Sequence, residues 1–233
     1  RPSAFRRALV VANPHSGPGR GRVTAAEAVA LVRPLGDHVE PGPTRGPGHA
    51  TELARAWAAA GGDLELRGLE PRQFDTVLRS LMECGCDITS NSTSVRLKRT
   101  ARLIAPQPVV TGPYPAFPTD AQPVLLATCL KASGTSVFVE NVFRNRYRYV
   151  YELRRLGAKV QIEGSVAVVT GVPELQGAPT TATDLRGGAA LVVAGLSAEG
   201  ETRVYDIGHI PRGYETLDEK LRALGADIRI TPD

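Results

Sequence analysis

The sequence predicts an α/β protein in which residues 49–233 form one inside-out, barrel-like α/β domain of three repeated units, with helices inside and sheets outside. Residues 1–48 are predicted to form a separate strand, loop and helix. The main observation is an internal repeat, in which Gly85, Gly157 and Gly225 fall at equivalent places, 72 and 68 residues apart. The second observation is the segment GGAALVVAGL, which is apolar on all sides and therefore favours a fully buried helix.

Each unit opens with a strand, because apolar and polar residues alternate there. Val137 and Val139 are the apolar positions that indicate this in the second unit, and Val204 indicates it in the third. A turn that carries an arginine and an aromatic residue follows each strand: Arg72 with Phe74, Arg146 with Tyr147, and Arg212 with Tyr214.

A helix of about twelve residues follows each turn and ends at the repeated glycine, where a left-handed cap is favoured. In the third unit its apolar positions are Leu217, Leu221 and Leu224. The next strands are expected to start at Ile88, Val160 and Ile228, and a further strand is expected over 166–170. One more apolar helix precedes each unit, over 50–60, 121–131 and 185–198. A repeat of about 70 residues suits a compact α/β subdomain used three times better than a solenoid.

Residues 1–48 have no counterpart in the repeats. They are predicted to form a buried strand over 8–12, a glycine-rich loop and a helix that begins near Thr24. Backbone N–H groups of such a loop can hold a phosphate. The residues of this possible phosphate loop are Asn13, Ser16, Gly17 and Gly19. A tight turn without a ligand is the alternative interpretation.

The composition is that of a globular protein, with a formal net charge of +4 and 42% hydrophobic residues. The basic residues are spread along the chain and interleaved with acidic ones, so no nucleic-acid partner is predicted. The longest apolar stretch, 187–198, is about half of the roughly 20 residues that a membrane-spanning helix needs. No membrane span is expected, and because the first residues lack the apolar stretch of a secretory signal, we expect a cytoplasmic location.

Neither a metal nor a cofactor is predicted. The three cysteines have neither a disulfide framework nor zinc-site spacing, and the four histidines are scattered. These residues are Cys84, Cys86, Cys129, His15, His38, His49 and His209.

Two aspartates, Asp120 and Asp184, begin the inner helices of the second and third units. Helix capping would explain either one alone. If the three units are related by an approximate three-fold axis, however, equivalent turns meet at one end, and Arg146, Arg186 and Arg212 are gathered there. Such a cluster binds phosphate and carboxylate groups, and a carboxylate within it can accept a proton from a hydroxyl group.

Four motifs lie in order along residues 50–230: PYPAFPTDAQ, ENVFRNRY, ATDLRGGAALVVAG and HIPRGYETLDEKLRALGADI. In these motifs the chain resembles the carboxy-terminal part of the enolpyruvyl transferase family, in its UDP-N-acetylglucosamine 1-carboxyvinyltransferase branch. The resemblance implies transfer of an enolpyruvyl group from phosphoenolpyruvate to the 3-hydroxyl of UDP-N-acetylglucosamine, with release of phosphate. This is a step of peptidoglycan precursor synthesis.

The same resemblance implies roles for individual residues. Asp120 would contact and deprotonate the sugar hydroxyl, the backbone of Val142 would contact UDP-N-acetylglucosamine, and Arg146 would lie near the reacting groups. Asp184 and Arg186 would lie beside the carbon and the carboxylate of phosphoenolpyruvate.

Arg212 would be a further arginine that holds an anion. Fixed positive charge of this kind stabilises a developing anion without rearrangement.

The chain departs from the family in one large respect. The complete family protein has two such three-unit domains, and its other domain carries a Lys-Asn pair and a mobile loop with a reactive cysteine. Cys84, Cys86 and Cys129 do not match that loop. A complementary half-domain is therefore a possible partner, and a non-catalytic domain that binds sugar nucleotides or a partner is the alternative function.

Residues about 5–60 resemble the start of the diacylglycerol and lipid kinase family, whose first strand ends in NPxSGxG, as NPHSGPG does here. That family also needs a GGDGT segment for its nucleotide. Here Gly61, Gly62 and Asp63 run directly into LELRG. A fragment of a lipid or nucleotide kinase is the third function considered.

Overall fold

The computed structural model describes residues 63–67, 69–99, 101–214, 216–223, 226 and 228–230. The predicted helix over 50–60 and the predicted segment 1–48 lie outside the described residues. The possible phosphate loop of Asn13, Ser16, Gly17 and Gly19 lies outside them as well, as do Leu224 and the third repeated glycine, Gly225.

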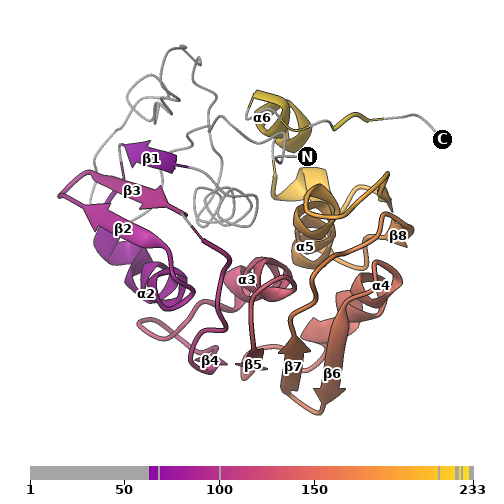
Figure 1. Ribbon diagram of the computed structural model, residues 1–233, viewed down its shortest axis with the longest axis horizontal. Coiled ribbons are helices and arrows are strands. Elements are labelled where there is room, and N and C mark those ends of the chain that lie inside the picture. Colours follow the sequence, from indigo (N-terminus) through magenta and orange to yellow (C-terminus); the bar gives the residue numbers. More distant parts are fainter. Residues whose placement is uncertain are drawn as a thin grey trace.

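The described elements follow one another in three sets (Figure 1). The first set is β1 (Asp63–Arg67), the 3-10 turn η1 (Pro71–Phe74), α2 (Asp75–Glu83), β2 (Asp87–Ser90) and β3 (Ser94–Lys98). The second is β4 (Val109–Val110), η2 (Thr119–Ala121), α3 (Gln122–Cys129), β5 (Thr135–Val139), η3 (Arg146–Tyr149), α4 (Val150–Arg155), β6 (Lys159–Glu163) and β7 (Val166–Thr170). The third is β8 (Pro179–Thr181), α5 (Leu185–Leu196), β9 (Arg203–Tyr205), η4 (Ile210–Arg212) and α6 (Leu217–Ala223).

The strand pairing confirms the repeat of the first two units. The first sheet has the order β1-β3-β2, and the second contains β5-β7-β6 in the same antiparallel arrangement, with β4 added parallel to β5. Asp63 pairs with Lys98 in the first sheet, and Thr135 pairs with Thr170 in the second. Each residue of the second pair therefore lies 72 positions after its counterpart in the first pair. In the third unit β8 and β9 form a parallel pair, as β4 and β5 do.

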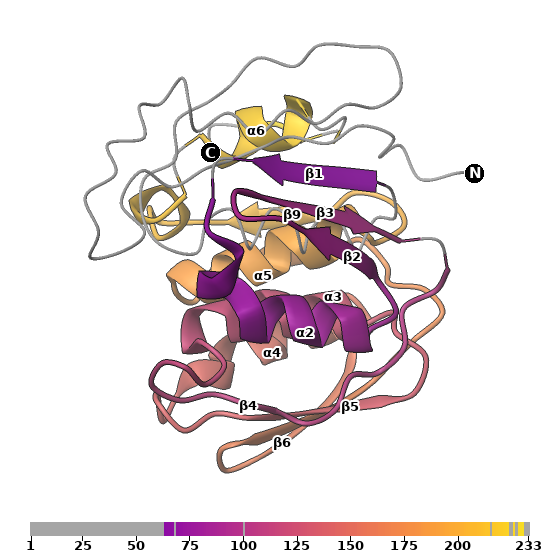
Figure 2. The same cartoon turned by 90° about the vertical axis from the view of Figure 1, so that its left-hand side faces the viewer.

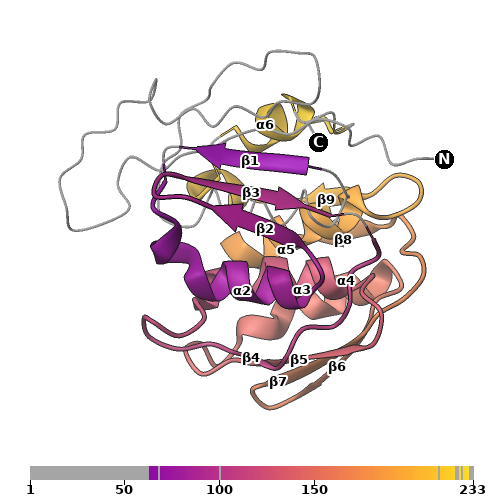
Figure 3. The same ribbon diagram turned by 60° about the vertical axis from the view of Figure 1, so that its left-hand side comes forward.

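Helices occupy the centre of the molecule and sheets the outside, as predicted. In Figures 2 and 3 the helices α2, α3, α4 and α5 lie between the three-stranded sheet and the four-stranded sheet, whereas α6 lies beyond β1. The helices α3 and α5 pack against each other, and all eight residues of α3 are buried. Burial on every side explains why the sequences of these two helices lack an amphipathic pattern.

The strand predicted from Val137 and Val139 is confirmed as β5. Both valines are half-buried, whereas Ser136 and Phe138, which alternate with them, are buried. Phe138 faces the helices together with Ala167 and Val169 of β7. The β-branched residues therefore lie on the outer face, where they favour extended backbone without forming the core.

Two of the three repeated glycines, Gly85 and Gly157, end their helices in the left-handed conformation, as predicted. Gly85 has φ of +88° and Gly157 has φ of +87°, a region that residues with a Cβ atom rarely adopt.

The strand expected at Ile228 is wrong, because residues 228–230 are not in a strand. In the first two units the corresponding strand pairs with β3 or β7, and the described residues of the third unit contain no such partner strand.

The central position of α3 predicts that its leucines stabilise the whole fold. Leu125 has no exposed surface, whereas Met82 on α2 is 54% exposed. We expect Leu125→Ala to lower the free energy of unfolding by about 2–5 kcal/mol, because it leaves a cavity between packed helices. Met82→Ala should change it by no more than about 0.5 kcal/mol. Urea unfolding followed by circular dichroism measures both, and equal losses would contradict the central placement of α3.

Candidate functional site

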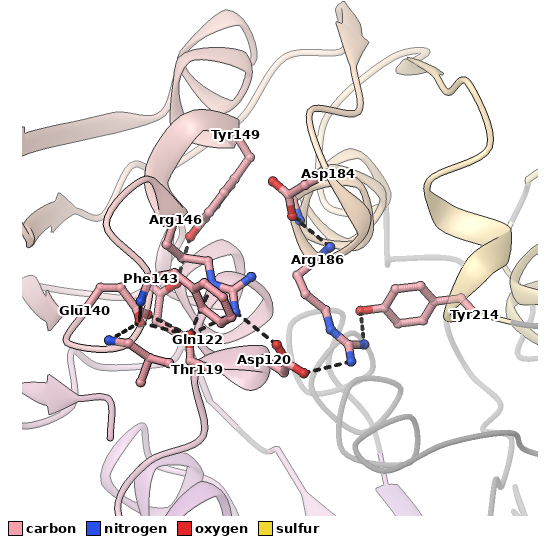
Figure 4. Close-up of polar contacts among 12 residues, drawn as sticks. Thr119, Asp120, Gln122, Glu140, Phe143, Arg146, Tyr149, Asp184, Arg186 and Tyr214 are labelled. Carbon is pink, nitrogen blue, oxygen red and sulfur yellow. Dashed lines mark hydrogen bonds and ion pairs between the residues drawn. The ribbon is translucent and has the colours of Figure 1, made fainter. Parts of the chain in front are cut away.

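Asp120 lies at the centre of a group of polar side chains at the amino-terminal ends of the inner helices (Figure 4). It belongs to η2, which leads into α3, and Pro123 at the start of α3 favours helix initiation there. Oδ1 of Asp120 accepts a hydrogen bond from Nη2 of Arg146, and Oδ2 accepts one from Nη2 of Arg186, both at 3.0 Å. Asp120 thus joins an arginine of the second unit to an arginine of the third, and it is not the helix cap that was considered as an alternative.

Asp184 is the amino-terminal cap of α5, as the alternative interpretation predicted for it. Its backbone is extended, and its Oδ1 accepts the backbone N–H groups of Arg186 at 3.0 Å and Gly187 at 2.9 Å. A Cβ atom at Gly187 would lie 2.7 Å from Cβ of Tyr149, so glycine is required there for the close approach of the two units. The cap fixes the first turn of α5 and thereby the direction in which Arg186 leaves the helix.

Arg186 is held at two sides. Its Nη2 binds Asp120, and its Nη1 donates to the hydroxyl of Tyr214 at 3.1 Å. The guanidinium carbon lies 5.4 Å from the centroid of the Tyr214 ring, and Tyr214 is itself buried. Tyr214 had been recognised only as the aromatic residue of a repeated turn, and its contact with Arg186 was not predicted.

Arg146 is held by its neighbours in the second unit. Its Nε and Nη2 donate to Oγ1 of Thr119 at 3.2 and 2.9 Å, and its guanidinium lies over the ring of Phe143 at 4.4 Å. Within the part of the chain that the structure describes, no partner is recorded for Nη1 of Arg146. Two N–H donors of this arginine therefore remain for a ligand.

Glu140 is a buried carboxylate behind Arg146, only 3% exposed. Its Oε1 accepts the backbone N–H groups of Val142 at 2.9 Å and Phe143 at 3.0 Å, and the hydroxyl of Thr119 lies 2.9 and 3.0 Å from its two oxygens. The N–H of Val142 is thus already bound, which leaves its carbonyl oxygen as the backbone atom for the predicted ligand contact. Neither Thr119 nor Glu140 was predicted as a site residue, although they lie within the motifs PYPAFPTDAQ and ENVFRNRY.

The charges and exposures of the three central side chains suit an anionic ligand. The side chains of Arg146 and Arg186 are 10% and 15% exposed, whereas that of Asp120 is 52% exposed. The partly desolvated guanidinium groups present fixed N–H donors, which bind phosphate and carboxylate oxygens strongly. The accessible carboxylate between them can accept a proton from a bound hydroxyl group.

Arg212 is not part of this group. It ends η4, is exposed, and among the described residues makes no recorded contact with Asp120, Arg146 or Arg186. Its function as an anion-holding residue stays a prediction.

The cysteines are buried and free. The hydrogen bond with Cys129, together with burial, raises the pKa of the Cys84 thiol, and burial raises the pKa of Cys86 to about 11. Both thiols are therefore protonated near neutral pH, whereas a nucleophilic cysteine requires a thiolate.

In the described residues, no three His, Cys, Asp or Glu side chains are placed to hold a metal ion. None of the helices in those residues combines the length and apolarity needed to cross a membrane.

Residues 47–221 match the family model described as EPSP synthase (3-phosphoshikimate 1-carboxyvinyltransferase). The chain belongs to this family. Residues 7–65 match the model of the diacylglycerol kinase catalytic domain, which confirms the second resemblance found in the sequence. The boundary between the two parts at residues 48 and 49 stays a prediction.

Among curated relatives, the chain is 48% identical over 177 residues to UDP-N-acetylglucosamine 1-carboxyvinyltransferase of Desulfofundulus thermocisternus, covering 76% of this chain and 72% of that protein. It is 47% identical over 173 residues to UDP-N-acetylglucosamine 1-carboxyvinyltransferase 3 of Caldanaerobacter subterraneus, covering 74% of this chain and 41% of that protein. It is 41% identical over 217 residues to UDP-N-acetylglucosamine 1-carboxyvinyltransferase of Chelativorans sp., covering 91% of this chain and 48% of that protein.

Two solved structures have the same fold. The enolpyruvyl transferase NikO from Streptomyces tendae is 28% identical, with a TM-score of 0.67 over 80% of this chain and 46% of that one. EPSP synthase from Acinetobacter baumannii, at 16% identity and a TM-score of 0.63, covers 93% of this chain and 57% of that one and shows the fold alone. The chain spans less than half the length of several of these relatives.

The cap of α5 gives a test that separates hydrogen bonding from charge at Asp184. Asp184→Ala should lower the free energy of unfolding by about 1 kcal/mol, because two backbone N–H groups lose their acceptor. Asp184→Asn, which keeps a side-chain acceptor, should come close to the original stability. For a chain of this size, 1 kcal/mol corresponds to about 2–4 °C in Tm, which calorimetry resolves. An Asn variant as unstable as the Ala variant would show that the charge, and not the cap, stabilises this end of α5.

Proposed function

We propose that this chain supplies half of an active site that transfers the enolpyruvyl group of phosphoenolpyruvate to the 3-hydroxyl of UDP-N-acetylglucosamine. The single observation that carries the proposal is the Asp120 carboxylate held between Arg146 and Arg186. Such an arrangement places a proton acceptor beside two anion-binding groups, which this reaction requires. The relatives with 41–48% identity carry the name of this activity, which supports the choice of substrates.

Asp120 acts on the sugar in this proposal. Each carboxylate oxygen has a second lone pair besides the one that accepts from an arginine, so Asp120 can also accept a hydrogen bond from the 3-hydroxyl. When it takes the proton, the hydroxyl oxygen forms a bond to the carbon of phosphoenolpyruvate that carries the phosphate, and the electrons of the carbon–carbon double bond take up a proton from solvent at the neighbouring carbon. Loss of a proton from that neighbouring carbon then restores the double bond, and the phosphate leaves with the electrons of its carbon–oxygen bond.

The arginines act on phosphoenolpyruvate. Nη1 of Arg146 offers two N–H donors towards a phosphate or carboxylate oxygen, and Arg186 brings a second positive charge. Both guanidinium groups are already fixed, by Thr119 and by Tyr214. Donors that need no rearrangement stabilise developing negative charge most effectively.

The remaining part of the site comes, in this proposal, from a complementary half-domain. The chain spans 41% and 48% of the length of two of its relatives, and its buried thiols are unsuited to the reactive cysteine that the family resemblance implies. The cell-wall role and the cytoplasmic location expected from the sequence belong to this proposal. A non-catalytic domain that binds the sugar nucleotide is the second candidate, because Arg146 and Arg186 can bind an anion without the reactive cysteine that the family resemblance implies.

Binding of the sugar nucleotide tests the contribution of this chain. Titration calorimetry with UDP-N-acetylglucosamine should show binding to the original chain and a loss of about tenfold or more in affinity for Asp120→Ala, because a charged hydrogen-bond acceptor is removed. The matched control is Asp75→Ala, which removes another exposed aspartate that is ion-paired with an arginine, on α2 of the first unit. The proposal is contradicted if Asp120→Ala and Asp75→Ala bind the sugar nucleotide with the same affinity.

Phosphate release separates the two candidate functions. The chain is incubated with both substrates, alone and together with a separately produced complementary half of a relative. Phosphate release that occurs only when both halves are present supports the transferase function. Sugar-nucleotide binding without release in any mixture supports the non-catalytic domain.

A further inference from the structure

We propose that Glu140 and Thr119 are positioning residues for Arg146, linked by hydrogen bonds that run in one fixed direction. This inference rests on the proposed function. It adds Glu140 and Thr119, which were not among the predicted site residues, to the residues that the function needs. The linked side chains run from Glu140 through Thr119 and Arg146 to Asp120 (Figure 4).

The first step concerns the burial of Glu140. A carboxylate that is 3% exposed is costly to bury unless its oxygens are hydrogen-bonded. Within the described residues no Lys or Arg nitrogen is recorded at ion-pair distance from it, and its recorded donors are two backbone N–H groups and one hydroxyl. Glu140 therefore acts only as an acceptor, and every group around it is oriented to donate.

The second step concerns the single hydrogen of the Thr119 hydroxyl. Because a guanidinium group can only donate, the bonds from Nε and Nη2 of Arg146 occupy both lone pairs of the Thr119 hydroxyl oxygen, and its single hydrogen is donated to Glu140. The lone pairs of Oγ1 then face the other way, where Nε and Nη2 of Arg146 donate to them at 3.2 and 2.9 Å. Glu140 thus determines that Thr119 is an acceptor for Arg146.

The third step concerns the orientation that Thr119 gives to the Arg146 guanidinium group. Two donors on one oxygen fix the plane of Arg146, and the second hydrogen of Nη2 is directed at Oδ1 of Asp120 at 3.0 Å. Phe143, whose ring lies under the guanidinium, is held through its N–H by the same Glu140. The buried carboxylate thereby sets both the direction of Arg146 and the turn beneath it, and Nη1 is left to face a ligand.

A pair of substitutions at Thr119 separates the role of its hydroxyl from that of its methyl group. Thr119→Val keeps the shape and removes the hydroxyl, whereas Thr119→Ser keeps the hydroxyl. We expect the Val variant to bind UDP-N-acetylglucosamine about tenfold or more weakly, and the Ser variant to bind within about twofold of the original chain. A merely structural role of the methyl group would give the opposite order, which would overturn the proposal.

Arginine Nε–H signals in nitrogen-15 NMR give a readout that does not depend on any substrate. The signal of Arg146 is identified by its loss in Arg146→Lys. Slow hydrogen exchange at this site is expected in the original chain and in Thr119→Ser, and fast exchange in Thr119→Val. Glu140→Gln should also speed exchange, because its amide nitrogen can donate to Thr119 and compete with Arg146, while its oxygen can still accept from the turn.

The two readouts separate the two proposals. If the original chain fails to bind the sugar nucleotide, the proposed function fails. Hydrogen exchange measured by NMR then decides by itself whether Thr119 and Glu140 position Arg146. An Arg146 signal that exchanges slowly in both Thr119→Val and Glu140→Gln would overturn the positioning role, whatever the chain binds.

Discussion

The candidate site depends on one carboxylate shared between two guanidinium groups. Asp120 binds Arg146 of its own unit and Arg186 of the next, so it connects the second and third repeats at the ends of their inner helices. Because Asp120 is half exposed, this contact adds little to the stability of the chain. Its importance is chemical, since it collects opposite charges at a point that a ligand can reach.

The inside-out fold explains why these groups meet. Equivalent helices of successive units pack side by side in the centre, so their amino-terminal ends come together, and the turns that follow the strands lie around them. The positive end of a helix dipole favours negative charge, which suits the cap at Asp184 and an incoming anion alike. Gly187 permits the close approach of the units that this arrangement needs.

Local patterns were sufficient to predict the glycine caps at Gly85 and Gly157 and the cap at Asp184, because each depends on residues a few positions apart. The repeat was predictable because the same local patterns recur along the chain. They were not sufficient for contacts between distant segments. The bond between Glu140 and Thr119 spans 21 residues, and the bond between Arg186 and Tyr214 spans 28. Nothing in the local sequence indicates that a buried glutamate will meet one particular hydroxyl. The alternation that predicted β5 also does not identify which side of the strand meets the helices, since strand propensity is the same on both sides.

The most direct test of the shared carboxylate is a crystal structure of the chain with bound UDP-N-acetylglucosamine. The account predicts that the 3-hydroxyl of the sugar lies within hydrogen-bond distance of Asp120, while Arg186 keeps its bond to the other carboxylate oxygen. A sugar nucleotide bound away from Asp120, or an Asp120 that has turned away from both arginines, would contradict it.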